Sequence, residues 1–268
     1  MFAILANVIE ERLKRFAPRQ SKGISYREAG SGRALLLLHG IGSSSASWLN
    51  QLEGVKGFRL IAWDAPGYGE SGYLKNEKPH PRDYAQELEG FVERLLLKDI
   101  VLVGNSLGCL MAGSFAKNNQ ERVRKMLLIS PAGGYGGDTK VLNERLKALE
   151  ELGPEGMAEK RSPTLLGAKA PPEALELVRW SQRRVHPQGY RQAAYCLSSG
   201  RLADDARSYR KQVLVVCGTE DRITPEAGCK AVAQAFPLSE YRSLPGIGHV
   251  AHIEDPALIN KTIAGFAA

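Results

Sequence analysis

The fold is decided by the stretch Ile100-Val101-Leu102-Val103-Gly104-Asn105-Ser106-Leu107-Gly108. A short apolar run ends here in Gly-x-Ser-x-Gly, and a helical pattern follows from Leu107 to Lys117. A sharp strand-to-helix turn exposes the serine hydroxyl in a strained conformation. It needs glycine on either side, because side chains there would collide with neighbouring backbone. The following helix also points its positive end at negative charge beside Ser106. The stretch therefore predicts a nucleophilic serine at the end of a strand.

Short apolar runs recur on both sides of this stretch. They cover residues 34–38, 58–63, 126–129, 213–217 and 241–244. Helical patterns lie between most of them, for example over residues 82–97 and 225–236. Near-continuous apolar strands that alternate with helices are typical of a parallel sheet covered on both faces. We therefore predict an α/β fold with a mostly parallel central sheet and helices on both faces.

The alternation stops between residues 129 and 213. This stretch begins with a glycine-rich run and continues as helical patterns over residues 140–152, 172–185 and 187–197. Because the sheet resumes afterwards, the insert lies at the carboxyl ends of the strands, where ligands bind in open α/β sheets. We predict a core formed by residues 1–133 and 209–268, and an inserted helical cap, or lid, formed by residues 134–208.

A nucleophilic serine requires a base and an orienting acid, and residues of both types follow later strands. Asp221 lies just past the run 213–217, and His249 ends Pro245-Gly246-Ile247-Gly248-His249 after the run 241–244. Each candidate thus lies at a strand end, in the chain order serine, acid, histidine. We expect Ser106 to be the nucleophile, His249 the base and Asp221 the acid that orients it.

The acid and the base each have a competitor. Glu220 adjoins Asp221, but two neighbours on a turn point in different directions, and we favour Asp221. His252 lies three residues past His249 and is expected to be a surface or packing residue. The remaining histidines are His39, expected to be structural at a strand end, and the loop residues His80 and His186.

An oxyanion hole needs backbone amides that converge where negative charge forms on the substrate oxygen. Leu107, directly after the nucleophile, offers one amide. The turn His39-Gly40-Ile41-Gly42 offers the other, and Ile41 is our candidate donor. The flanking glycines, Gly40 and Gly42, let the backbone approach the substrate closely.

The chain resembles the α/β-hydrolase superfamily along nearly its whole length. The motifs that carry the resemblance are His39–Gly42, Trp63–Ser71, the serine turn, Gly218–Pro225 and Gly248-His249. The helical insert resembles the cap domain of that superfamily. Because the nucleophile position holds serine and not aspartate, the haloalkane dehalogenase and epoxide hydrolase branches are disfavoured.

Within the superfamily, the chain resembles the meta-cleavage-product hydrolases. These enzymes cleave a carbon–carbon bond in acidic dienones from aromatic-ring breakdown. Asn105 precedes the serine as in that branch, and Arg179-Trp180, followed by Pro187, resembles a cap segment whose arginine holds the substrate's carboxylate or keto group. The resemblance therefore implies substrate-binding roles for Asn105, Arg179 and Trp180.

The chain departs from that branch at two positions. The branch has a glycine-rich, proline-containing oxyanion loop, whereas this chain reads Ile41-Gly42-Ser43-Ser44. It also has tryptophan after the catalytic histidine, whereas Val250 follows here. We expect Gly40, Gly42 and Val250 to lie at the substrate site.

Charge and composition indicate the kind of partner. The 268 residues are 43% hydrophobic and 24% charged, as in soluble globular proteins, and the formal net charge is +7. Residues 179–211 hold eight basic and two acidic side chains, a surplus expected to draw small anions toward the site. We therefore expect a small acidic carbonyl substrate. No nucleic-acid partner is expected, because no groove-reading motif is visible.

Cysteine spacing and the length of the apolar runs exclude further classes. The four cysteines are widely spaced, so we expect buried free thiols in a reducing cytoplasm, and no metal or cofactor. The apolar runs are far shorter than the ~20 residues of a membrane span. Residues 2–16 have amphipathic helical spacing without the features of a signal peptide. We expect no membrane partner, and the sequence leaves a homodimer open.

We interpret the chain as a serine hydrolase of esters, or of the carbon–carbon bond of a dienone acid. Two alternatives stay open. One is a cofactor-free haloperoxidase or perhydrolase, in which the same triad works on a small carboxylic acid and peroxide. The other is a non-catalytic ligand receptor on the same fold.

Overall fold

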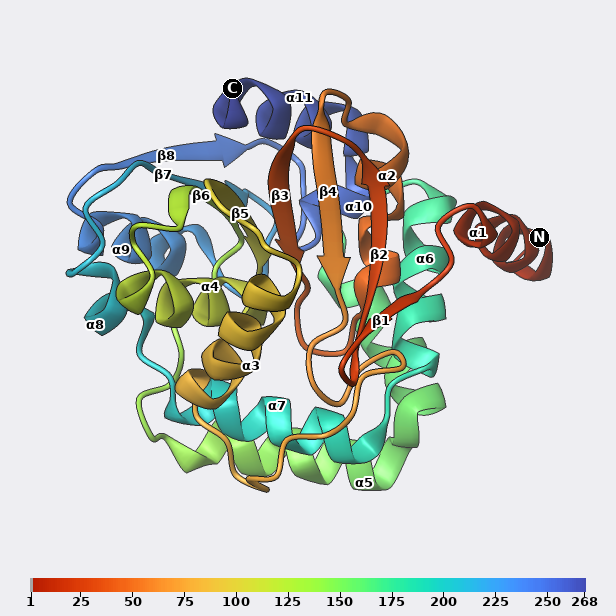
Figure 1. The fold of residues 1–268 in the computed structure, drawn as a ribbon. Coiled ribbons are helices and arrows are strands. Elements are labelled where there is room, and N and C mark those ends of the chain that lie inside the picture. The colour runs from red at the N-terminus through yellow and green to blue at the C-terminus, as the bar shows by residue number, and fades with distance from the viewer. Residues whose placement is uncertain (1) are drawn as a thin grey trace.

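The computed structural model describes residues 2–268, so Met1, counted in the predicted core, lies outside it. The described chain forms an eight-stranded sheet in the order β1-β2-β4-β3-β5-β6-β7-β8 (Figure 1). The strands are β1 (Arg19–Ser21), β2 (Ile24–Gly30), β3 (Arg33–Leu38), β4 (Phe58–Trp63), β5 (Ile100–Asn105), β6 (Val123–Ile129), β7 (Val213–Gly218) and β8 (Ser239–Leu244). The β1–β2 and β2–β4 pairs are antiparallel, and the remaining pairs are parallel.

Helices connect most of the parallel strands. They are α1 (Phe2–Lys14), α2 (Leu49–Gly54), α3 (Pro81–Arg94), α4 (Leu107–Asn118), α5 (Thr139–Arg161), α6 (Pro172–Arg183), α7 (Pro187–Ser199), α8 (Leu202–Ala206), α9 (Glu226–Ala235), α10 (Ala251–Glu254) and α11 (Pro256–Ala267), with 3-10 helices η1 (Ser45–Trp48) and η2 (Ser162–Leu165). Proline stands in the first turn of α3, α6, α7 and α11. Its fixed φ and missing N–H suit a helix start.

The sheet is buried on both faces because successive side chains of a strand point to opposite sides. In β3, Leu36 and Leu38 join a core that includes side chains of α3 and α4. Leu35 and Leu37 join a second core with α2 and α11. The continuous apolar run of this strand thus serves two cores, as predicted for the parallel part of the sheet.

Each apolar run predicted to be a strand forms one, but the structure adds β1 and β2 at one edge. β1 is polar throughout and largely exposed, and β2 mixes polar with apolar residues, so neither strand has the continuous apolar signal. β2 is held in place by antiparallel pairing with β4, in which Tyr26 lies opposite Trp63. Their strand character therefore depends on the partner strand rather than on their own pattern.

Helices α5 to α8 lie between β6 and β7 in the chain. In Figure 1, α5 and α7 cross the end of the sheet toward which the arrow of β4 points. This end holds the loops after the parallel strands, where ligands bind in such sheets. Helix α1 packs on α6, where Ile9 and Leu13 share an apolar cluster with Leu177 and Val178. The N-terminal helix therefore packs on the helical segment, and it also bonds directly to α2, where Arg12 pairs with Glu53 at 2.6 Å.

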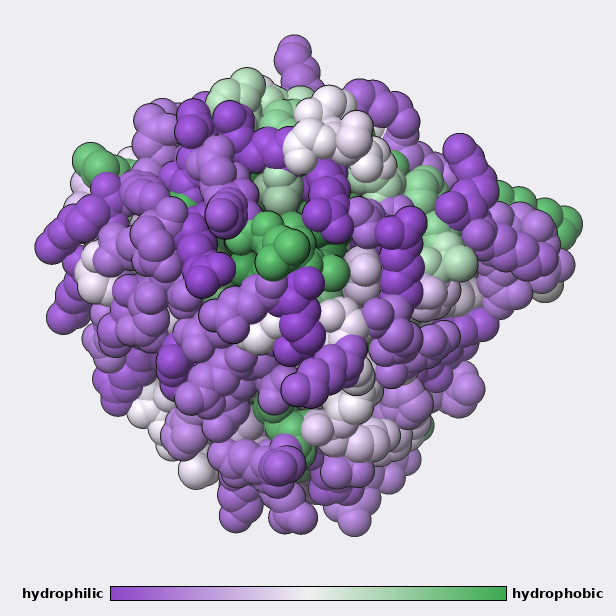
Figure 2. Space-filling model, viewed as in Figure 1, coloured by the Kyte–Doolittle hydropathy of each residue, from purple (hydrophilic) through white to green (hydrophobic). Residues whose placement is uncertain are grey.

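The surface drawn in Figure 2 is largely hydrophilic, with an apolar tip on α1. Exposed large apolar side chains include Ile4 and Val8 of α1 and Leu96. No helix within residues 2–268 combines the length and apolar character needed to cross a bilayer. All four cysteines are buried free thiols.

Candidate active site

The turn between β5 and α4 holds Ser106 in a strained backbone conformation. Its φ is 53° and its ψ is −116°, a combination that residues other than glycine rarely adopt. The Ser106 amide donates to the Ile129 carbonyl at 3.0 Å, and its carbonyl accepts from the Cys109 amide at 3.0 Å. Strand β6 and the first turn of α4 therefore fix the strained residue from both sides.

Glycines on either side of Ser106 make this turn possible. A Cβ atom on Gly108 would lie 2.1 Å from the carbonyl oxygen of Leu38, and one on Gly104 would lie 2.9 Å from the Cys109 amide nitrogen. Helix α4 thus packs directly on the backbone of β3. This close approach is the physical reason for the two glycines of the motif.

Asp221 and His249, from the loops after β7 and β8, form a hydrogen-bonded pair. His249 Nδ1 donates to Asp221 Oδ2 at 2.9 Å. Asp221 Oδ1 accepts the amides of Ile223 and Thr224 at 2.8 and 2.9 Å. Burial disfavours the charged carboxylate, but the hydrogen bond and charge of His249, together with the other donors, outweigh it and lower the pKa of Asp221. Asp221 is therefore ionised and holds the His249 proton on Nδ1.

The competing acid and the strand-end histidine have other partners. Glu220 Oε2 accepts the Ala168 amide at 2.6 Å, on the loop after η2. His39 is buried, and its Nε2 accepts the Ala65 amide at 3.0 Å while its Nδ1 donates to the Gly40 carbonyl at 2.8 Å. Glu220 thus anchors a loop, and His39 braces the turn after β3.

His252 is a buried packing residue. Its ring lies against the Trp48 indole, with centroids 4.3 Å apart. Within the described chain, neither ring nitrogen has a hydrogen-bond partner. Burial, together with the nearby His249 and His39, lowers the pKa of His252 to about 3. The ring is therefore neutral in the folded protein.

The His252→Phe variant is expected to lose less stability in acid than the wild type. The pKa of His252 is about 3 when folded against an ordinary 6.5, so between these values only the unfolded chain takes up the proton. Stability therefore falls as pH falls through this window, by about 1.4 kcal/mol for each pH unit. Urea unfolding at pH 7.0, 5.5 and 4.5 measures the difference. The exposed His80 provides a control for losing one histidine, His80→Gln. Equal acid losses in His252→Phe and wild type would contradict this expectation.

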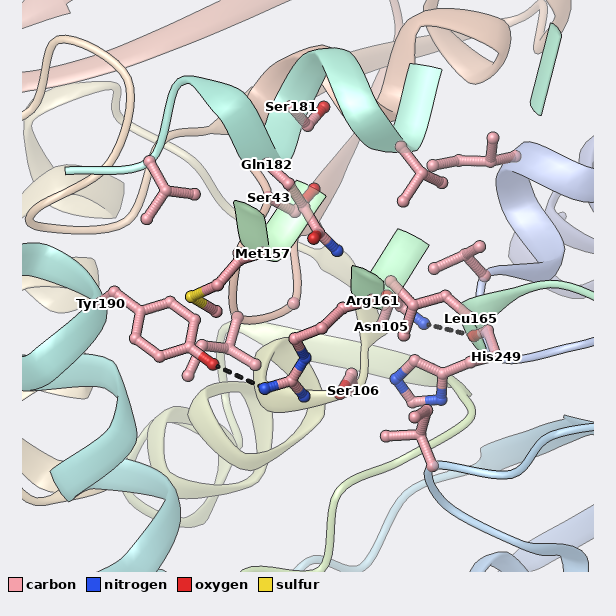
Figure 3. Close-up of a pocket in the computed structure, with 18 of the residues that line it drawn as sticks. Ser43, Asn105, Ser106, Met157, Arg161, Leu165, Ser181, Gln182, Tyr190 and His249 are labelled. Carbon is pink, nitrogen blue, oxygen red and sulfur yellow. Dashed lines mark hydrogen bonds between the residues drawn. The ribbon is translucent and has the colours of Figure 1, made fainter. Parts of the chain in front are cut away.

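Ser106 and His249 line one pocket between the strand ends and helices α5 to α7 (Figure 3). From the residues singled out in the sequence, the pocket brings together Gly40, Ile41, Gly42, Asn105, Ser106, His249 and Val250. The empty space within the pocket, including its open mouth, has a volume of about 750 Å³. Most of the lining side chains are apolar, with a few polar groups among them, as is typical of a small-molecule site.

The helical segment is attached to the loop that carries His249. The His249 amide donates to the Leu165 carbonyl at 2.8 Å. The carboxylate of Glu254 accepts the amides of Gly167 and Gly248. These bonds hold one wall of the pocket in register with the histidine.

The loop after β3 passes close to the serine turn. A Cβ atom on Gly40 would lie 3.1 Å from Ser106 Cβ. Gly42 has a φ of 78°, which favours glycine, and its amide donates to Tyr68 Oη at 3.4 Å. Ile41 lies between them and lines the pocket, while Leu107 begins α4 directly after Ser106.

Asn105 lines the pocket and also holds two backbone segments together. Its Nδ2 donates to the carbonyls of Ile129 and His249, at 3.2 and 3.1 Å. The amide group of this side chain therefore positions the His249 loop. Such a role is additional to the substrate contact that the resemblance implies.

The structure does not bring Arg179 and Trp180 to the pocket. Arg179 pairs with Glu159 at 3.0 Å, and Trp180 Nε1 donates to Glu10 at 3.2 Å. Neither is among the pocket-lining residues of the described chain. Helix α6 turns other side chains toward the pocket, namely Val178, Ser181 and Gln182. Spacing along the sequence identified helix α6 but not which of its faces is turned toward the pocket.

Two arginines that were not singled out in the sequence line the pocket instead. They are Arg145 and Arg161, both on α5. Arg145 lies between Leu142 and Leu149 on the buried stripe of this helix. A charged residue on an apolar stripe is the signal that identifies such a position, because arginine is almost never buried without a partner.

The doubly covered sheet, the strained serine turn and the strand-end pocket together have the architecture of an α/β hydrolase. The sequence model of the alpha/beta hydrolase family matches residues 35–262. The chain therefore belongs to the alpha/beta hydrolase family, and the predicted fold and hydrolase class are confirmed.

Relatives matched along nearly the whole chain include carbon–carbon bond hydrolases. The chain is 27% identical to the 2-hydroxy-6-oxononadienedioate/2-hydroxy-6-oxononatrienedioate hydrolase of Comamonas testosteroni, over 98% of this chain and 99% of that protein. It is 26% identical to the 2-hydroxy-6-oxo-6-phenylhexa-2,4-dienoate hydrolase of Burkholderia cepacia, again over 98% and 99%. The predicted resemblance to this branch is confirmed.

Solved structures agree on the fold. The esterase of Thermogutta terrifontis, with malate bound, superposes with a TM-score of 0.82 at 26% identity, over 94% of this chain and 96% of that one. The enol-lactonase of Burkholderia xenovorans LB400 superposes with a TM-score of 0.84 at 22% identity, over 93% and 99%. The second likeness concerns the fold alone.

Proposed function

We propose that the chain is a serine hydrolase in which Ser106 attacks a carbonyl carbon, His249 takes the serine proton and Asp221 orients His249. The observation that carries this proposal is the convergence of two features in one pocket. Ser106 lies there on its strained turn, beside a histidine already hydrogen-bonded to a carboxylate. Figure 3 draws the Ser106 and His249 side chains next to each other. This arrangement is the one that nucleophilic catalysis requires.

The reaction follows from these roles. As Ser106 Oγ bonds to the carbonyl carbon, its proton passes to His249 Nε2 and the carbonyl oxygen becomes an oxyanion. The amides of Ile41 and Leu107 donate to that oxyanion. When the carbonyl re-forms, the bond to the leaving group breaks, and His249 gives its proton to the leaving atom. Water then attacks the acyl-serine with His249 as base, which releases an acid and restores the hydroxyl.

The substrate is a small carbonyl compound, either an ester or the carbon–carbon bond of a dienone acid. The names of the relatives from Comamonas testosteroni and Burkholderia cepacia support the second bond type. For that substrate, the dienol first becomes a ketone, which makes the departing carbon a better leaving group. Residues 134–208 act as a cap, since their side chains form much of the pocket wall.

Labelling with a fluorophosphonate probe tests the nucleophile. We expect one adduct for each chain, on the peptide that contains Ser106, and none in the Ser106→Ala variant. Folded wild-type protein that takes up no label would overturn the proposal and favour the ligand receptor. Turnover that requires peroxide and a carboxylic acid, with no hydrolysis of esters or dienones, would favour the perhydrolase.

The bond type is tested by mixing the protein with a dienone acid and with a p-nitrophenyl ester. Loss of the dienone's visible absorbance identifies carbon–carbon cleavage, and release of p-nitrophenolate identifies ester hydrolysis. The rates at equal concentration rank the two activities.

A further inference from the structure

Two guanidinium groups meet in the pocket without a carboxylate between them. Arg145 and Arg161 both donate through Nη1 to Tyr190 Oη, at 3.4 and 3.2 Å. Figure 3 shows Arg161 between Tyr190 and Ser106. Within the described chain, no aspartate or glutamate lines the pocket. The two positive charges therefore face the pocket with phenolic rather than anionic partners.

Such a pair is costly in the folded protein. Arg145 is only 8% exposed, and its Nε is buried without a hydrogen-bond partner in the described chain. Burying an ionised group costs free energy unless an opposite charge or hydrogen bonds compensate. Burial lowers the pKa of Arg161, and the like charge of Arg145 adds to this effect. Burial also disfavours the charge on Arg145, but the phenol groups of Tyr190 and Tyr135 outweigh burial and raise the pKa of Arg145. A bound anion would offset both the burial and the repulsion.

A kink in α5 brings the two arginines together. Sixteen positions separate Arg145 from Arg161, about 24 Å along a straight helix. Gly153 interrupts α5 with a φ of 59° and a ψ of −180°, and Pro154 follows. The positive φ favours glycine, and proline suits the first turn of the second half. Because the helix changes direction here, both guanidiniums reach the same oxygen of Tyr190.

The arginines and His249 lie on different sides of the nucleophile. In Figure 3, Ser106 lies between the Arg161 guanidinium and the His249 ring. His249 protonates the leaving group, so the leaving group must extend toward His249. The acyl part of the substrate then extends the other way, toward Arg145 and Arg161. A planar guanidinium matches a carboxylate through two parallel hydrogen bonds.

We infer that Arg145, Arg161 and Tyr190 form a subsite for a carboxylate at the far end of the substrate's acyl group. This inference rests on the proposed function, because the direction of the acyl group follows from the roles of Ser106 and His249. The substrate class is thus monoesters, or related acyl compounds, of small dicarboxylic acids. Arg179 lies outside the pocket lining of the described chain and takes no part in this subsite.

A matched pair of esters tests the subsite. Mono-p-nitrophenyl adipate and p-nitrophenyl hexanoate have the same acyl length and leaving group, and differ only in the terminal carboxylate. Arg145→Met and Arg161→Met keep an unbranched side chain without the charge. We expect each variant to lower kcat/KM for the adipate ester by about 10- to 100-fold. We expect kcat/KM for the hexanoate ester to change by less than about threefold.

The matched control is Arg184→Met on the edge of the same helical segment. Arg184 is half exposed, pairs with Glu10 and lies outside the pocket lining of the described chain. We expect this variant to treat both esters as the wild type does. The variants should take up the fluorophosphonate label at Ser106, which shows that a loss on the adipate ester is not a loss of the nucleophile.

Calorimetric titration measures the subsite without turnover. Adipate is titrated into Ser106→Ala protein and into the same protein carrying Arg161→Met. We expect binding to the first and at least tenfold weaker binding to the second. Failure of labelling and hydrolysis in the wild type would overturn the proposed function. The titration would still test the anion subsite, because it measures binding without turnover.

Several results would overturn the subsite. An equal fall in kcat/KM on both esters would assign the arginines a structural role. A loss of kcat/KM on the adipate ester in Arg179→Met, with Arg145→Met and Arg161→Met unaffected, would show that Arg179 holds the carboxylate. A loss confined to 4-carboxyphenyl hexanoate would place the carboxylate on the leaving group. Equal binding of adipate in both titrations would show that the arginines hold no anion.

Discussion

The Ser106→Ala variant is expected to lose about three orders of magnitude or more of kcat/KM on p-nitrophenyl hexanoate. Without the hydroxyl no acyl-serine forms, and the remaining rate comes from binding and from amides that stabilise the oxyanion. Alanine keeps the backbone of the turn, in which Ser106 is held by bonds to Ile129 and Cys109. The fold should therefore survive the change. Release of p-nitrophenolate, followed at several substrate concentrations, measures the loss.

Ser114→Ala is the matched control for this change. Ser114 lies on the same helix, α4, and is also buried, but it does not line the pocket of the described chain. We expect its turnover to stay within about twofold of the wild type. Near-normal turnover in Ser106→Ala, with both variants folded by circular dichroism, would remove Ser106 from the proposed mechanism.

The Gly108→Ala variant is expected to lower the free energy of unfolding by about 3 kcal/mol or more. The new Cβ would lie 2.1 Å from the Leu38 carbonyl oxygen and 2.9 Å from that of His39. Both atoms belong to the backbone at the end of β3, which is paired to strands on each side and cannot yield locally. Helix α4 must therefore shift away from the sheet. Since α4 begins at the serine turn, turnover should fall together with stability.

Gly228→Ala separates this steric effect from the general effect of an added methyl group. Gly228 lies within α9, and a Cβ there would meet no atom within 4 Å. Alanine in such a helix position is expected to raise stability by about 0.5–1 kcal/mol. Thermal unfolding of the two variants and the wild type measures both effects. A Gly108→Ala protein as stable and active as the wild type would show that the helix does not pack this closely on β3.

Much of the fold could be predicted from the sequence because its signals are local. The four leucines of β3 indicate a strand buried on both faces, and Gly104 and Gly108 indicate close helix packing. Strands β1 and β2 were not predicted, because neither has a continuous apolar pattern and pairing orders them, β2 against β4 and β1 against β2. A strand of this kind has no signal of its own.

In the candidate site too, some residues could be located from the sequence, whereas other contacts are set only by the fold. Ser106, Asp221 and His249 could be selected from the sequence, because the carboxyl ends of parallel strands meet at one edge of the sheet. Asn105 could be located, but its bond to the His249 carbonyl depends on two loops that meet only in the fold. Arg179 was selected by spacing, and helix rotation pairs it with Glu159 instead.

The sequence by itself determined the six strands β3 to β8, the serine turn and the order of the candidate catalytic residues, because the signal for each lies in neighbours within a few positions. The tertiary structure alone decided which charges face the pocket. Arg145 and Arg161 meet at Tyr190 because α5 kinks at Gly153 and packs against α7. The apolar stripe of α5 marks Arg145 as a buried position, but which pocket that stripe faces is set by packing between elements far apart in the chain.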